Sequence, residues 1–318
     1  MARFIARRFI SMVPLLILVS MMAFSLILLL PGDPALAILG EERANADNKA
    51  AYYALRAELG LDDPVPIQYL RWAGRAVRGD FGMSIRNKTP IGETIGTRIW
   101  PTAELALLAA IISVVIAFPA GIISALRPNS WADAGATLAA LGGVAIPHFF
   151  LGILLIYAFA VWFRVLSPSG YVAPWEDLGQ NLKLMIMPAF AVGTGLAAIL
   201  MRQIRSALIE VLNQEYVITA RSKGLAERAV VIGHALKNAS IPVITIMGQQ
   251  VGTLIGGAVV TETIFAIPGM GRLIVESISF RDFPVVQAAV LMLALSVLVA
   301  NLLTDITYGF LDPRIRHD

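Results

Sequence analysis

The sequence predicts an all-α membrane protein with six transmembrane helices. Of its 318 residues, 57% are apolar and only 15% are charged, whereas soluble domains are about one quarter charged. Six segments are long enough to cross about 30 Å of hydrocarbon, which takes about 20 apolar residues, and none of them contains Asp, Glu, Lys or Arg. These segments are residues 9–30, 105–126, 134–163, 184–201, 238–261 and 283–304.

The first segment follows three arginines and could be mistaken for a secretory signal. Its apolar run, residues 9–30, is longer than the 7–15 residues that are usual for the apolar part of such a signal. We therefore expect it to be retained as the first transmembrane helix. The third segment is long enough to tilt or to contain a break near Pro147, and the fourth is the shortest of the six.

The basic residues predict the orientation in the membrane, because loops on the cytoplasmic side are enriched in Lys and Arg. With both termini inside, the inner segments contain Arg3, Arg7, Arg8, Arg127, Arg202, Arg205, Arg221, Lys223, Arg228, Lys237, Arg314 and Arg316. The two short outer loops contain only Arg164, Lys183, Arg272 and Arg281. Both termini and the polar stretch 213–242 are therefore expected on the cytoplasmic side.

The long segment between the first two spans, about residues 31–104, has the composition of a soluble protein. One short helix is expected to end at Gly60, since glycine often follows a helix C-terminus. A second is expected from about Pro66 to Gly79, with an apolar stripe made by Leu70, Ala73 and Val77. We expect this segment to cap the outer mouth of the helix bundle, to offer a docking surface, or both.

The sequence lacks the motifs of several function classes. It has no Gly-Lys pair and so no P-loop, no H-E-x-x-H or G-x-S-x-G motif, and no cysteine. We therefore predict no catalytic residue and no metal site. The basic residues form no dense patch, so nucleic acid is not an expected partner. His148, the histidine inside a span, is expected to be a hydrogen-bonded packing residue rather than part of a proton relay.

The fifth segment combines small and polar residues. Gly248, Gly252 and Gly256 recur every four residues and predict a stripe where another helix packs closely. Polar groups in the same span must face protein or a watery path, because lipid offers them no hydrogen-bond partners. We predict that this span lines the pathway with three side chains, Gln249, Gln250 and Thr253.

The stretch from residue 213 to residue 242 is polar and is expected to form a helical hairpin. Asn213 is expected to cap a first helix that Gly224 terminates, and a second helix is expected to end before Pro242, where the fifth span begins. A helix this short is marginal on its own in water, so it needs a surface to dock against. Lipid headgroups, solvent or the groove of a partner protein are the alternatives.

Here the sequence resembles the permease subunits of bacterial ABC importers. Their cytoplasmic EAA loop is matched by Glu215, by Thr219-Ala220, where Thr219 replaces the first signature Ala, by Gly224 and by Ile241-Pro242. Nearly the whole chain is covered in order by the stretches PGDPA, LGLDDPVPIQYLRW, GDFGMSI, TAELALLA, TARSKGL, HALKNASIPV, ETIFAIPGMGRL, DFPVVQAAV and LDPRIR. Together these motifs are similar to those of the B-type subunit of the dipeptide, oligopeptide and nickel permease family.

The resemblance implies a type I importer in the bacterial cytoplasmic membrane. It implies a first helix over residues 1–30, an outer segment over 31–98, a core over 99–312 and a cytoplasmic tail over 313–318. The implied partners are a second permease, two ATPases that hold all ATP and Mg²⁺, and an external substrate-binding protein. The binding protein would dock near Phe265, Pro268, Gly269 and Arg272. The implied contact with an ATPase is made by Glu215, Tyr216, Thr219, Ala220, Arg221, Gly224 and Leu225.

The sequence does not identify the cargo. Peptide, nickel and oligosaccharide importers share these motifs, and the neutral polar groups of the fifth span suit many substrates. An ion-coupled transporter is a rival, but it needs ionisable groups within the spans, which the assigned segments lack. A membrane-embedded enzyme is a second rival, and it needs a nucleophile with a base or a metal cluster. We therefore expect an ATP-driven permease that imports peptides by alternating access.

Overall fold

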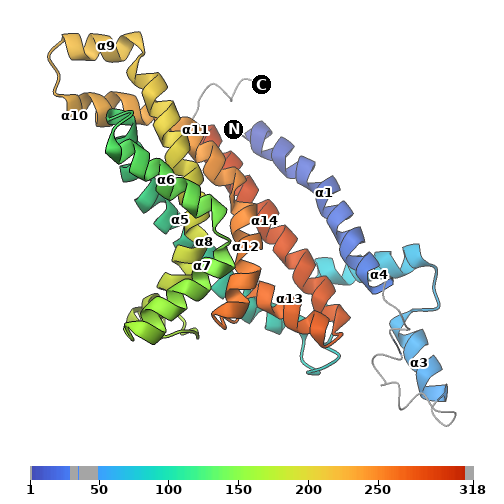
Figure 1. The fold of residues 1–318 in the computed structure, drawn as a ribbon. Coiled ribbons are helices and arrows are strands. Elements are labelled where there is room, and N and C mark those ends of the chain that lie inside the picture. Colours follow the sequence, from blue (N-terminus) through green and yellow to red (C-terminus); the bar gives the residue numbers. More distant parts are fainter. Residues whose placement is uncertain (1, 29–34, 36–48, 312–318) are drawn as a thin grey trace. The chain divides into compact units, whose positions relative to one another are not determined.

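The structure is a computed structural model that describes residues 2–28, 35 and 49–311 (Figure 1). Within these residues the regular structure is helical, apart from one isolated β-bridge between Met83 and Pro90. The all-α prediction is confirmed. The described residues fall into two compact units. We call the parts within 1–6, 101–271 and 297–318 the core unit, and the parts within 7–100 and 272–296 the N-terminal unit.

Five helices in the described part of the chain are long and apolar enough to cross a membrane. They are α1 (Ala2–Leu28), α5 (Ile91–Leu126), α8 (Leu178–Leu212), the helix from Glu227 to Gln249, and α14 (Phe283–Leu311). The number becomes six when a bent pair is counted as one span. This pair consists of α6 (Trp131–Ala145) and a helix made of α7 (His148–Leu155) and a π-helical segment (Ile156–Trp162).

The bent pair contains the break that the sequence predicts near Pro147. Its two helices meet at 104°. Proline has no backbone N–H and pushes the preceding residue out of the helical region, and Ile146 accordingly has an extended backbone with φ −83° and ψ 119°. The predicted third segment therefore contains a break, and α7 starts in a new direction at His148.

The fifth span differs from the single segment expected over residues 238–261. It is divided into α11 (Leu236–Gln249) and α12 (Val251–Ile264), which meet at Gln250. The Gln250 N–H is shared between the carbonyls of Ile246 and Met247, which tightens the turn locally. Pro242 lies inside α11 instead of starting the span, since the preceding helix continues without a gap from Glu227.

Helix α8 is the central helix of the core unit, although the sequence marks its span as the shortest. In its apolar window 78% of the residues are buried, and it packs against α6, α7, α11 and α12. The helix is longer than its apolar run because polar turns extend it at both ends. Its N-terminus is capped by Asp177, whose carboxylate accepts a hydrogen bond from the Gln180 N–H.

The two short helices of the N-terminal unit occur where the sequence places them. Helix α3 (Lys49–Leu59) ends at Gly60, whose φ of +66° suits glycine, and α4 (Val65–Val77) follows. The predicted stripe is not buried, since Leu70 is 67% and Val77 88% exposed. A neighbouring face of α4 packs instead.

That packing face of α4 presents aromatic side chains to α1. The rings of Tyr69 and Trp72 lie 5.7 Å and 5.8 Å from the ring of Phe24. The Tyr69 hydroxyl is also hydrogen-bonded to the Ser20 hydroxyl at 2.8 Å. Aromatic area and a shared hydrogen bond explain why this face is chosen over the smaller aliphatic stripe.

A buried carboxylate joins distant segments of the N-terminal unit. Asp282 accepts hydrogen bonds from the Ser84 hydroxyl and from the backbone N–H groups of Ile85 and Arg86. The guanidinium of Arg86 lies 3.3 Å from the centroid of the Phe280 ring. These contacts explain why the segment around residue 282 belongs to the same unit as residues far earlier in the chain.

Gly193 gives a test of the central position of α8. A Cβ atom there would lie 2.6 Å from the Ala109 carbonyl oxygen of α5, whereas a Cβ at Gly135 of α6 would meet nothing within 4 Å. We expect Gly193→Ala to destabilise the protein by about 1–3 kcal/mol through overpacking. Gly135→Ala should be neutral or stabilise by up to about 1 kcal/mol. Thermal melting of the purified proteins measures both, and equal melting temperatures would contradict the close approach.

Candidate functional site

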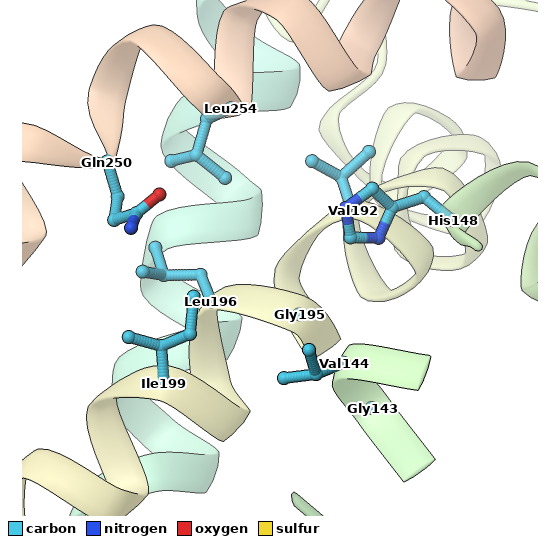
Figure 2. A pocket seen from close by; sticks show the side chains of 9 residues that line it. All are labelled: Gly143, Val144, His148, Val192, Gly195, Leu196, Ile199, Gln250 and Leu254. Carbon is cyan, nitrogen blue, oxygen red and sulfur yellow. The ribbon is translucent and has the colours of Figure 1, made fainter. Parts of the chain in front are cut away.

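The polar residues predicted to line the pathway separate in the structure. Gln250 lies in the wall of a small cavity of the core unit, at the junction of α11 and α12 (Figure 2). Gln249 is exposed and does not line that cavity. The side chain of Thr253 lies outside the described part of the structure. Adjacent residues of a helix point in different directions. This cavity therefore has Gln250 in its wall but not Gln249.

The three glycines of the fifth span also have different neighbours. A Cβ at Gly248 would overlap the Thr304 side chain, and one at Gly252 would lie 3.3 Å from Cγ1 of Val297. Both neighbours belong to α14, so these glycines permit a close approach of helices. A Cβ at Gly256 would meet nothing within 4 Å. The stripe is used at two positions in this chain, and the third faces open space.

The turn after α12 is predicted to face a docking protein. It is anchored to the core unit by Phe265. The side chain of Phe265 is fully buried, and a Cβ at Gly152 would lie 3.0 Å from its ring. Its carbonyl accepts a hydrogen bond from the Gly170 N–H. Gly269 is buried as well. Pro268 is half-buried, and Arg272 forms an ion pair with Glu276 at 2.7 Å.

A buried carboxylate that the sequence reasoning missed explains this turn. The side chain of Glu262 is fully buried and accepts a 2.5 Å hydrogen bond from the Thr102 hydroxyl of α5. The same hydroxyl accepts a hydrogen bond from the N–H of Met270, the first residue of α13 (Met270–Ser279). A side chain at Gly269 would collide with the carboxylate. The glycine next to Pro268 is therefore required by close packing.

The polar hairpin projects beyond the end of the helices that it connects, at the top left of Figure 1. Helix α9 (Glu215–Ser222) is followed by α10 (Glu227–Ala229) and a π-helical segment (Val230–Ala235). We call residues 213–235 the α9 hairpin. The expected cap is wrong, because Asn213 ends α8 and its side-chain amide donates to the Ile209 carbonyl. The turn at Gly224 is as expected, with φ +81°.

The α9 hairpin has its own small core. Val217, Ala220 and Val230 are buried and pack against the end of α8. The Tyr216 hydroxyl accepts a 2.7 Å hydrogen bond from the Asn238 side chain. The apolar edge of α9 is therefore covered by its own chain. The exposed predicted contact residues are Glu215, Tyr216, Thr219, Arg221, Gly224 and Leu225.

Arg221 closes the hairpin instead of pointing freely outward. Its guanidinium donates to both carboxylate oxygens of Glu227, at 2.6 Å and 3.1 Å, and to the Leu212 carbonyl at 3.4 Å. The Glu227 carboxylate raises the pKa of Arg221 through this hydrogen bond. An exposed pair contributes little to stability, but two parallel hydrogen bonds fix geometry well. Arg221 therefore sets the spacing between α9 and the helix that follows.

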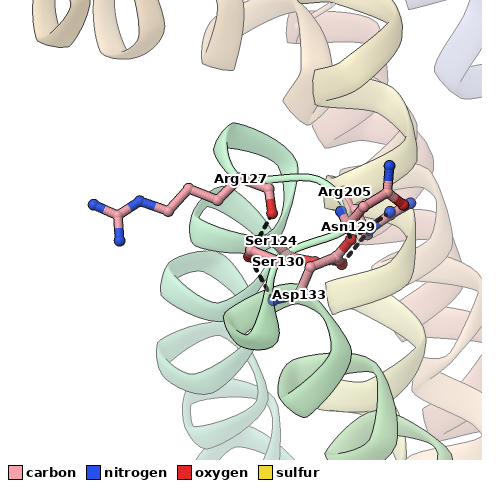
Figure 3. A network of polar contacts seen from close by, with 6 residues as sticks. All are labelled: Ser124, Arg127, Asn129, Ser130, Asp133 and Arg205. Atoms are coloured by element: carbon pink, nitrogen blue, oxygen red, sulfur yellow. Dashed lines mark hydrogen bonds and ion pairs between the residues drawn. The ribbon is translucent and has the colours of Figure 1, made fainter.

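A charged network lies just beyond the ends of the predicted third and fourth spans (Figure 3). Asp133 of α6 is only 5% exposed, and its two oxygens accept hydrogen bonds from Arg205 of α8 at 2.7 Å and 2.8 Å. The Ser124 hydroxyl and the Asn129 N–H donate to the same carboxylate. The Asp133 N–H in turn donates to the hydroxyl of Ser130, which caps α6.

Hydropathy does not predict this network, because the apolar segments stop at the charged residues, just after Asp133 and before Arg205. The helices continue past that point, so α6 begins at Trp131 and α8 runs on through Arg205. The pattern Ser130-x-x-Asp133 before an apolar run is a helix-start signal that could have revealed it. The Asp133–Arg205 ion pair therefore links the turn between α5 and α6 to the C-terminal part of α8, shortly before the α9 hairpin.

Comparison with known proteins decides the family. Residues 117–317 match the family model described as binding-protein-dependent transport system inner membrane component. Residues 1–106 match the model for the N-terminal part of such components. The chain belongs to this family.

Its relatives match over nearly their whole length. A putative peptide permease of Brucella suis biovar 1 is 39% identical over 99% of both chains. The dipeptide transport system permease protein DppB of Escherichia coli K12 is 37% identical, over 100% of this chain and 99% of the relative. The glutathione transport system permease protein GsiC of the same strain is 38% identical over 100% of both. The family member described here is thus a B-type permease.

The fold agrees with this family. The MetNI methionine ABC transporter contains a chain of similar fold, with a TM-score of 0.55 and 17% sequence identity over 69% of this chain and 96% of that one. The protein is therefore a multi-pass inner-membrane permease of an ABC importer, within the peptide and glutathione transport family. It is a non-catalytic membrane subunit. Such a permease works with ATPase and binding-protein partners, and the ATPases bind the nucleotide.

The Asp133–Arg205 pair gives a test in this permease. Removing one partner leaves a charge without its counter-ion in a mostly buried place, whereas replacing both by apolar residues does not. We expect Asp133→Leu and Arg205→Met each to lower the melting temperature of the purified transporter. The double variant should regain most of that loss. Additive losses in the double variant would show that the pair is not a unit.

Thr102 gives a second test at the other end of the core unit. Thr102→Val keeps the shape but removes the hydroxyl that Glu262 and the Met270 N–H both use. We expect a loss of about 1–3 kcal/mol for the buried groups that lose this partner. Thr102→Ser keeps the hydroxyl and should stay within about 1 kcal/mol of wild type. Thermal melting separates the two, and a Thr102→Val protein as stable as wild type would show that these buried groups do not depend on the hydroxyl.

Proposed function

We propose that this chain forms, with a second homologous permease, the path by which peptides delivered by an external binding protein enter the cell. Two ATPases would dock on the α9 hairpins, one on each permease, and drive alternating access. The observation that carries the proposal is the α9 hairpin itself. It is a preformed element that projects beyond its neighbouring helices and covers its own apolar edge, and it belongs to a chain without a P-loop.

The exposed face of α9 suits insertion into a groove. Ile218 and Leu225 are more than one third exposed, beside the exposed polar side chains of Glu215 and Thr219. A helix of this length is not stable alone, but packing of Val217 and Ala220 on its own chain supplies the missing support. A helix held rigid before binding loses little conformational entropy on docking, which favours a preformed contact.

The hairpin is also placed to pass movement into the membrane. Helix α8 enters it and the helix Glu227–Gln249 leaves it, so both of its arms continue into spans. The Arg221–Glu227 ion pair holds these arms at a fixed spacing. A shift of the hairpin would therefore move two spans together. ATP binding in the partners would favour one arrangement only through better contacts in that state, as any population shift requires.

Peptides are the cargo that best fits the relatives. The curated relatives described above are named for dipeptides, glutathione and peptides. Nickel or an oligosaccharide is the alternative cargo for the same architecture. Among the described residues, no group of three or more His, Cys, Asp or Glu could hold a metal ion. We further propose the orientation that the basic residues favour, with the α9 hairpin and both termini in the cytoplasm.

Gly224 provides the test of the hairpin. Its φ is +81° and a Cβ added there would meet nothing within 4 Å, so a substitution strains the backbone without a steric clash. Gly224→Val should cost about 1–3 kcal/mol in the turn and should reduce ATPase copurification or uncouple ATP hydrolysis from uptake. Gly224→Asn is the control, because asparagine tolerates this conformation. A Gly224→Val transporter that retains its ATPases and imports normally would refute the assignment.

A further inference from the structure

The core unit contains a cavity of about 160 Å³. His148 and Gln250 are its polar side chains, and they lie on opposite sides of it (Figure 2). The rest of the wall is glycine and apolar residues. The lining residues are Gly143, Val144, His148, Val192, Gly195, Leu196, Ile199, Gln250 and Leu254.

The cavity lies beside the break in one span and a locally tightened turn in another. His148 starts α7 directly after the break at Pro147, and Gln250 is the junction between α11 and α12. The α8 residues in the wall, from Val192 to Ile199, are near the middle of a 35-residue helix, about 20 Å from either end at 1.5 Å per residue. Interrupted helices near the middle of the bilayer form the substrate sites of many transporters, because freed polar groups can face the cargo there.

The imidazole of His148 is held in one orientation. Its Nδ1 lies 3.2 Å from the Ala191 carbonyl oxygen, which can only accept, so Nδ1 carries a hydrogen. The ring packs against Gly195, where a Cβ would lie 2.5 Å from the ring carbon Cε1, and it approaches Gly257 on another side. In the neutral ring Nε2 is then a hydrogen-bond acceptor. Gln250 has both a donor and an acceptor in its amide.

These groups suit a peptide bond rather than an ion. A peptide N–H can donate to Nε2 of His148, and a peptide carbonyl can accept from the Gln250 amide. No carboxylate, lysine or arginine is among the lining residues, so a charged cargo would find no counter-charge in this wall. One imidazole and one amide are also too few ligands for a nickel ion in a dedicated site.

The cavity is too small to be a complete binding site. Complete small-molecule sites have about 300–1,000 Å³, whereas this cavity has about 160 Å³. That space fits one peptide unit with a small side chain, and a second permease would supply the remaining wall.

We propose that this cavity is a peptide-binding subsite on the translocation path, in which His148 and Gln250 hydrogen-bond one peptide group of the cargo. The proposal rests on the proposed function in peptide import and adds to it the residues that contact the cargo. The proposal also explains why residue 195 of α8 is a glycine, since a side chain there would displace the imidazole of His148.

Cysteine labelling tests occupancy of the cavity directly. The chain has no cysteine, so Val144→Cys introduces the chain's only thiol into the wall. Leu141→Cys is the matched control, because Val144 and Leu141 are both on α6 and both 51% exposed, but Leu141 does not line the cavity. The assembled transporter in lipid nanodiscs is treated with N-ethylmaleimide, with and without trialanine. Trialanine at about ten times its Kd should slow labelling of Val144→Cys about tenfold and leave Leu141→Cys unchanged.

Uptake into proteoliposomes tests the two polar groups. Gln250→Leu and His148→Ala should each lower uptake of a transported peptide by about three- to tenfold, the loss expected for one hydrogen bond. Copurification of the ATPases checks that each variant still assembles. Thr245→Val is the control, since its hydroxyl donates to the Ile241 carbonyl within α11 and is not in the wall. If His148→Ala fails to assemble, Gln250→Leu and the labelling experiment still decide.

A cargo panel separates failure of the subsite from failure of the proposed function. Wild-type transporter is supplied with trialanine, glutathione, Ni²⁺ and maltotriose. Import of Ni²⁺ or maltotriose without either peptide would overturn the peptide function, and the subsite with it. Import of a peptide at wild-type rates by Gln250→Leu and His148→Ala, with Val144→Cys unprotected by that peptide, would overturn the subsite alone. Protection together with reduced uptake supports both.

Discussion

Polar groups buried in a membrane-spanning helix bundle need partners inside the protein, because lipid cannot supply them. Three buried carboxylates in the part of the chain that the structure describes have such partners, and each lies next to a change in chain direction. Asp133 holds the turn between α5 and α6 to α8, and Glu262 holds the turn between α12 and α13. Within the N-terminal unit, Asp282 collects the N–H groups of a distant loop. The turns are thus fixed by specific hydrogen bonds, while apolar packing fills the spaces between them.

The consequence for coupling is that α8 acts as a stiff connection within the core unit. It is continuous from Leu178 to Leu212 and buried along most of its apolar length. Arg205 fastens it sideways to α6, and Asn213 ends it with a hydrogen bond to its own last turn. The hairpin after it is closed by Arg221. A partner that displaces α9 would therefore also displace α8, because Arg205 and Arg221 hold these elements in place. A flexible loop would not transmit the same displacement.

Much of this fold could be predicted from composition and from Pro and Gly. Apolar length indicated the spans, Pro147 indicated the break, and Gly60 and Gly224 indicated helix ends, because each depends on local backbone chemistry. The burial of Phe265, the packing face of α4 and the Asp133–Arg205 pair depend on which elements meet, and periodicity does not contain that information. Hydropathy also misplaced helix ends, since a helix continues through its first charged turn. The position of His148 and Gln250 on opposite sides of one cavity also depends on tertiary packing.

The break at Pro147, the tightened turn at Gln250 and the continuous α8 have complementary roles at the cavity. The helical ladder is broken at Pro147 and tightened at Gln250, so backbone rotation there disturbs fewer regular hydrogen bonds than it would within α8. Segments of this kind are where hinges are usually found. Because the interruptions also carry the two polar groups of the cavity wall, any rotation at them changes the distance between His148 and Gln250. A subsite built this way would bind peptide in one arrangement and release it in another, which is what alternating access needs from a site that must both accept and release its cargo.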